Sequence, residues 1–160
     1  LGGEFSQTLH ETCSIPLHAR AAALSKLGTE VEARLRVARQ LQSERLRLLK
    51  LLGREAVNVR GTPVAALQTE VAALGQEVGR LEAHCRALTD HVQSAVDELG
   101  GEFAEELSEV LRQPLHSQAP DLDKLVKDAD ARLLLARDLR TQRLQLLQVL
   151  GRQHVDIVGT

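Results

Sequence analysis

Apolar residues recur every three and four positions along residues 63–99, with polar residues between them. Valine stands mostly at one core position of this seam and leucine mostly at the other. Such a heptad pattern is buried against another helix, because each apolar side chain packs into a gap between side chains of a partner. We therefore predict a long coiled-coil helix whose core is Val64, Leu67, Val71, Leu74, Val78, Leu81, Cys85, Leu88 and Val92.

A different spacing, with apolar residues 11 positions apart, runs through residues 17–52 and again through residues 115–150. Leu24, Leu35 and Leu46 illustrate it in the first stretch. Eleven residues in three turns correspond to about 3.67 residues per turn, which is typical of a nearly straight helix. We predict a long helix in each stretch, ended by a glycine.

A shorter amphipathic stretch precedes each of these long helices, over residues 3–14 and residues 102–112. Pro16 follows the first stretch and Pro114 the second. The residue before a proline avoids helical geometry, so each stretch predicts a short helix that stops before the proline.

The chain contains an internal repeat. A shift of 98 residues aligns residues 1–62 with residues 99–160 without a gap, and 30 of the 62 positions are identical. This predicts a tandem array, with a first repeat over residues 1–98 and the first part of a second repeat after it. Thr62 is a good N-cap for the heptad helix, so we expect Thr160 to cap a further helix.

Charge is distributed unevenly along the first repeat. Residues 1–62 hold ten Lys or Arg and six Asp or Glu, whereas residues 63–98 hold two and six. A basic helix that is followed after a short corner by an acidic helix predicts an antiparallel hairpin. With an aromatic content of 1 %, we predict an all-α, elongated antiparallel helical bundle or coiled coil built from the tandem repeat.

A tandem unit of 98 residues with one short and two long helices resembles the spectrin-repeat class of three-helix bundles. The resemblance is one of periodicity and extends over the whole chain. It implies an elongated cytoskeletal or adaptor rod that binds partners along its length. An array of plain antiparallel coiled-coil hairpins fits the same periodicity.

Few residues offer catalytic or metal chemistry. His10, Cys13 and His18 have a spacing that zinc sites use, but the second copy keeps only the last of them, as His116. We interpret Cys85 as a packed residue of the seam. The sequence shows neither a Gly-rich phosphate loop nor a Ser/His/Asp pattern, so we expect no enzyme, no metal and no cofactor.

Basic residues border the apolar stripe of residues 17–52. Their stems are suited to covering leucines while their charged ends reach acidic flanks of a neighbouring helix. The alternative is a surface for nucleic acid, an anionic membrane or an acidic protein tail. The lack of stacking aromatics disfavours nucleic acid, and the narrow heptad seam favours a protein groove over lipid. This candidate basic strip, within residues 34–54, is Arg34, Arg36, Arg39, Arg45, Arg47, Lys50 and Arg54.

The long helix over residues 115–150 has a full apolar stripe, which we expect to pack on the earlier helices or on a second chain. We therefore predict a homodimer. No apolar run approaches 18 residues, and two cysteines favour a reducing compartment. These features predict a non-catalytic, cytoplasmic scaffold of cytoskeletal, centrosomal or adaptor type that binds protein partners rather than a small-molecule substrate. The predicted assembly stripe is Leu122, Leu125, Leu133, Ala136, Leu139, Leu144, Leu147 and Leu150.

Overall fold

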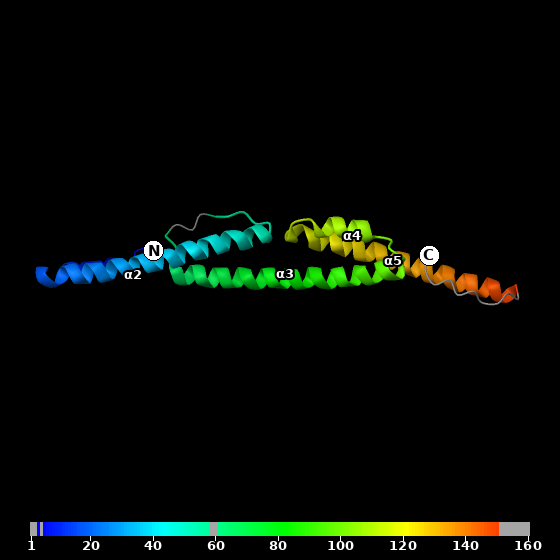
Figure 1. The fold of residues 1–160 in the computed structure, drawn as a ribbon, viewed down its shortest axis with the longest axis horizontal. Coiled ribbons are helices and arrows are strands. Elements are labelled where there is room, and N and C mark those ends of the chain that lie inside the picture. Colours follow the sequence, from blue (N-terminus) through cyan, green and yellow to red (C-terminus); the bar gives the residue numbers. More distant parts are fainter. Residues whose placement is uncertain (1–2, 4, 58–60, 151–160) are drawn as a thin grey trace. The chain divides into compact units, whose positions relative to one another are not determined.

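The computed structural model describes residues 3, 5–57 and 61–150 of the chain. All its regular elements there are helices, which confirms the all-α prediction (Figure 1). In order along the chain they are α1 (Ser6–Cys13), α2 (Leu17–Leu51), α3 (Val64–Glu98), α4 (Ala104–Leu111) and α5 (Leu115–Val149). The bounds of α4 and α5 lie 98 residues beyond those of α1 and α2.

Prolines and glycines mark the ends of the long helices. Pro16 and Pro114 stand just before α2 and α5, with extended backbone at ψ 144° in both cases. Gly53, at φ 67°, follows the end of α2. The Arg54 N–H then donates a hydrogen bond to the Leu49 carbonyl at 2.9 Å, which satisfies one of the last carbonyls of the helix.

The helices form two units, which we describe separately. Unit 1 comprises residues 1–79 and unit 2 residues 80–160, so the boundary falls inside α3. The sequence repeat begins again at Leu99. Unit 2 therefore combines the last part of the first repeat with the second repeat, and α3 contributes one half to each unit.

In unit 1, α2 and the first half of α3 lie side by side and run in the same direction (Figure 1). Arg45 Nε lies 2.7 Å from Glu70 Oε1, and Arg54 Nη1 lies 2.9 Å from Glu77 Oε2. In these two pairs, a higher residue number in the first segment goes with a higher number in the second, so the two segments are parallel. The antiparallel hairpin predicted from the charges is wrong for this pair.

The described part of the connection that follows α2, residues 52–57, explains the parallel arrangement. The Arg45 guanidinium donates a hydrogen bond from Nη1 to the Val57 carbonyl at 3.1 Å. Val57 thus lies beside the part of α2 that contains Arg45, which places it well before the end of that helix. After α2 ends, the chain turns back along that helix as far as Val57. The following helix, α3, therefore begins beside α2 and runs parallel to it.

Unit 2 packs the second half of α3, α4 and the first half of α5 around one core. Val92 and Leu122 have no exposed surface. His91 pairs with Asp130 and Glu98 with Arg137, so α5 also runs parallel to α3, and α4 provides the return between them. The buried core residues are Cys85, Val92, Val96, Leu107, Val110, Leu122 and Leu125.

The turn between α3 and α4 uses left-handed backbone. Gly100, Gly101 and Phe103 have φ angles of 71°, 99° and 72°. The Gly101 N–H donates to the Val96 carbonyl at 2.9 Å and so closes the end of α3. Left-handed backbone costs a non-glycine residue about 1–2 kcal/mol. Packing of the Phe103 side chain against the core of unit 2 offsets this cost.

We predict that Leu122→Ala lowers the free energy of unfolding of unit 2 by about 2–5 kcal/mol, because it leaves a cavity in a fully packed site. The matched control is Leu24→Ala. Leu24 holds the same position in the first repeat but is 39 % exposed in unit 1, so its truncation should cost much less. Urea denaturation followed by circular dichroism measures both variants. Equal losses would contradict the placement of Leu122 in the core.

Candidate interaction surface

The predicted coiled-coil seam forms the inward face of α3. In unit 1 it packs toward α2, and in unit 2 toward α4 and α5. The buried members are Val64, Leu67, Leu74, Val78, Cys85 and Val92, and the half-buried members are Val71, Leu81 and Leu88. Because helices of the same chain already cover it, the seam of α3 is not an open surface for another protein.

The predicted assembly stripe of α5 is divided into two parts by the structure. Leu122 and Leu125 lie in the core of unit 2, so these two residues are not available for assembly. The first half of α5 is therefore already packed against other helices of the same chain. Of the other members, Leu133, Ala136 and Leu147 are half-buried, whereas Leu139, Leu144 and Leu150 are exposed.

The second half of α5 exposes residues whose counterparts in α2 are buried. Leu48 in α2 is 4 % exposed, whereas Leu146, which is 98 residues further along, is 63 % exposed. Arg45 is buried, whereas Arg143 is exposed. In unit 1 the first half of α3 lies beside this part of α2, and Arg45 contacts Glu70 there (Figure 1). We name as the α5 face the set Leu139, Arg143, Leu146, Leu147 and Leu150, in which Leu147 is half-buried and the other members are exposed.

Arg143 and Leu146 are the members of the α5 face that the predicted assembly stripe does not contain. The predicted stripe lacks Leu146, although Leu135 and Ile157 stand 11 residues before and after it and so continue the same spacing. Its match in the repeat is Leu48, which the sequence analysis also left out. The burial of Leu48 against α3 is what identifies both residues.

Much of the candidate basic strip is engaged within unit 1. Arg45 is buried and contacts both Glu70 and the Val57 carbonyl. A bidentate pair of hydrogen bonds from Arg47 lowers the pKa of Glu44. In addition, Arg54 pairs with Glu77, and the Arg34 guanidinium lies 5.7 Å from the centre of the Phe5 ring.

Arg36, Arg39 and Lys50 are exposed, and these members of the strip show no such contact with any described residue. The strip is therefore not one continuous basic surface. This favours the interpretation in which the arginines hold neighbouring elements together.

The histidines of α3 pair with carboxylates of α5. His91 Nε2 lies 2.8 Å from Asp130 Oδ1, and His84 Nε2 lies 4.0 Å from Asp123 Oδ2. Burial raises the pKa of the Cys85 thiol, and the negative charge of Asp123 adds to the effect. Within the described ranges, no group of three or more His, Cys, Asp or Glu side chains is placed to hold a metal ion.

A groove of about 320 Å³ lies in unit 2 beside the α5 face. Leu139, Arg140 and Arg143 contribute to its lining on α5, and Glu98 and Glu102 contribute to its other wall. A hydrogen bond from Arg137 lowers the pKa of Glu98. The lining combines leucines with charged groups, which suits contact with another polypeptide.

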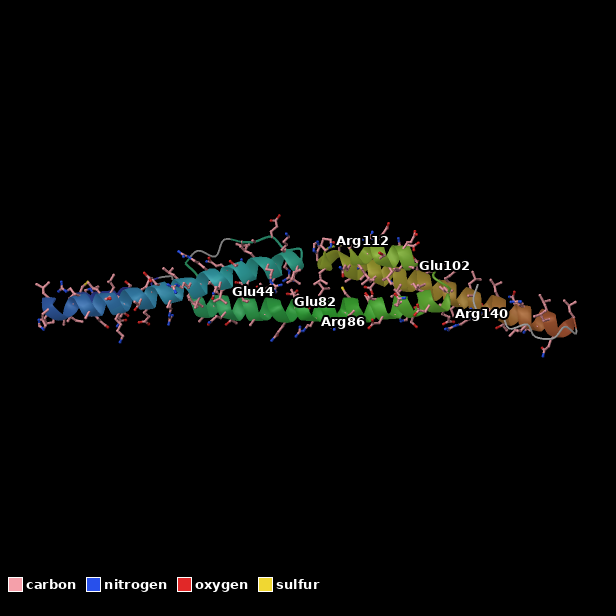
Figure 2. The ribbon with its side chains drawn as sticks, viewed as in Figure 1. Glu44, Glu82, Arg86, Glu102, Arg112 and Arg140 are labelled. Carbon is pink, nitrogen blue, oxygen red and sulfur yellow. The ribbon has the colours of Figure 1, made fainter. Side chains whose placement is uncertain are left out.

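Charged side chains project from both halves of α3 and from α5, among them Glu82, Arg86 and Arg140 (Figure 2). None of the helices in the described part of the chain is long and apolar enough to cross a membrane. Comparison of the chain with known protein families, with characterised proteins and with solved structures finds no match. Function is therefore inferred from the contacts and exposed faces described above.

We predict that Arg45→Gln lowers the free energy of unfolding of unit 1 by about 1–3 kcal/mol, because the Val57 carbonyl and Glu70 lose their charged donor. Arg143→Gln is the matched control. Arg143 is exposed and forms no ion pair with any residue that the structure describes, so its loss should change stability by less than about 0.5 kcal/mol. Urea titration of both variants measures the difference, and comparable effects would argue against the role given to Arg45.

We also predict that a maleimide modifies Cys13 much faster than Cys85. Cys13 is exposed, whereas Cys85 is buried and its raised pKa leaves less thiolate at neutral pH. Mass spectrometry of digested samples over time gives both rates. Leu122→Ala should speed the modification of Cys85 and leave Cys13 unchanged, because it loosens the core of unit 2 alone. Similar rates for the two thiols in the unaltered chain would refute this.

Proposed function

We propose that this chain is a non-catalytic structural module that assembles proteins through helix–helix contacts. The observation that carries the proposal is the α5 face, whose residues match residues that are buried or half-buried in unit 1. Exposed apolar surface of this extent on a long helix is typical of an interaction site. A scaffold of cytoskeletal, centrosomal or adaptor type would use such a surface.

The tandem arrangement supports the same proposal. The bounds of α4 and α5 repeat those of α1 and α2, and the identities between the two copies include the glycines and prolines that end the helices. Repeats that bury their apolar faces against neighbouring repeats build extended assemblies. The resemblance to spectrin repeats stays a prediction, as does the location of the protein in the cytoplasm.

We predict that the chain self-associates, with a homodimer as the first species, because the α5 face adds exposed leucines to a helix whose other half is already packed. Sedimentation equilibrium over a range of concentrations measures the mass. The double variant Leu139→Ser and Leu146→Ser should shift the equilibrium toward monomer.

Leu46→Ser is the control for this prediction, since Leu46 is an exposed leucine of α2 outside the matched face. It should leave the association constant unchanged. A chain that stays monomeric at all concentrations, or an equal response to Leu46→Ser, would contradict assembly through α5.

A further inference from the structure

We infer that the α5 face is a docking site for an amphipathic helix with the chemistry of the first half of α3. That chemistry is a seam of valine and leucine at heptad spacing, with a carboxylate on its flank that pairs with Arg143. The inference rests on the proposed function and names the partner that this surface accepts.

Unit 1 contains the template for this contact. The second half of α2 buries Leu48 and Leu49, and the first half of α3 buries Leu67 and Leu74 in the same unit. Beside these buried leucines, Arg45 reaches across to a carboxylate of α3 at 2.7 Å. The pair thus combines apolar burial, which supplies most of the stability, with one charged contact that specifies the register.

The second half of α5 repeats the α2 side of this contact residue by residue. The α5 face is identical to its match in α2 at every member. The matching pairs are Leu139 with Leu41, Arg143 with Arg45, Leu146 with Leu48, Leu147 with Leu49 and Leu150 with Leu52. The surface that lies beside α3 in unit 1 is therefore present a second time, and in unit 2 all its members except the half-buried Leu147 are exposed.

Charge also favours this occupant. Arg143 has no carboxylate partner among the residues that the structure describes, so an incoming helix that carries one completes the contact. The neighbouring polar positions of α5 include Asp138, Gln142, Gln145 and Gln148. Of the basic neighbours, Arg137 pairs with Glu98, and Arg140 lines a groove that Glu98 and Glu102 also line. An anionic membrane or a nucleic acid calls for a strongly basic border, which these residues do not provide.

The two repeats also show which leucine lies outside the site. Leu46 and Leu144 occupy matching positions and are both exposed, at 52 % and 41 %. Since Leu46 stays exposed while α3 covers its neighbours, Leu144 should remain exposed when the α5 face is occupied. Leu144 therefore provides a control of the same residue type, on the same helix, two positions from Leu146.

The test uses the full chain and a fluorescent peptide with the sequence of residues 62–79. An isolated helix of this length is marginal in water, so a lactam staple on its polar face keeps the peptide helical. Fluorescence anisotropy is measured at chain concentrations where sedimentation shows the monomer. We expect saturable binding that Leu146→Ser weakens at least tenfold and that Leu144→Ser leaves unchanged.

A charge exchange identifies the predicted ion pair. Arg143→Glu in the chain should weaken binding of the unaltered peptide at least tenfold, and Glu70→Lys in the peptide should restore it. Restored binding would show that the peptide binds at α5 and not at the matching site on α2, because Arg45 in that site is unaltered. Release of α3 from α2 is also disfavoured, because both belong to one chain and meet at a high effective concentration.

Binding that does not respond to Arg143→Glu or Leu146→Ser would overturn the inference, as would the absence of saturable binding by the stapled peptide up to millimolar concentration. The proposed function is judged separately. A chain that self-associates but does not bind the peptide retains the proposed function and refutes the docking site. A chain that binds the peptide and stays monomeric retains the docking site and refutes the homodimer.

Discussion

Burial of the α3 seam is the interaction on which both units depend. Val64 and Leu67 at the start of the helix are buried in unit 1, and Cys85 and Val92 further along are buried in unit 2. Each fully buried side chain of this size contributes roughly 1.5–3 kcal/mol. The ion pairs around the seam are mostly exposed and contribute about 0–1 kcal/mol each, so they adjust the register of helices that apolar contact already holds.

Helix direction in this protein is determined by the connections rather than by the charges. A basic helix and an acidic helix attract each other in either orientation, because the charges are spread along their flanks. In unit 1, the chain returns along α2 through the segment that Arg45 fastens at Val57. In unit 2, α4 performs the same return as a helix of eight residues. Both pairs of long helices consequently run parallel.

Local pattern predicted the helices and their ends well, because the spacing of apolar residues and the positions of Pro16 and Gly53 act over a few residues. The seam residues of α3 follow from the same periodicity. The direction of pairing could not be derived this way, since it depends on how residues 52–57 turn back along α2. The exposure of Leu146 could not be predicted from the sequence either. It depends on which helix lies beside this residue in the structure, not on the residues next to it in the chain.

The identity of the matched faces on α2 and α5 has a consequence for biosynthesis. The first half of α3 encounters two nearly equivalent partners in the finished chain, and an exchange between them would give a misfolded or intertwined product. On the ribosome, however, α2 is complete before α3 emerges, and α5 is made after both. Vectorial synthesis therefore lets the correct pair form while its competitor does not yet exist. Refolding from denaturant lacks this order and should be the slower and more error-prone route.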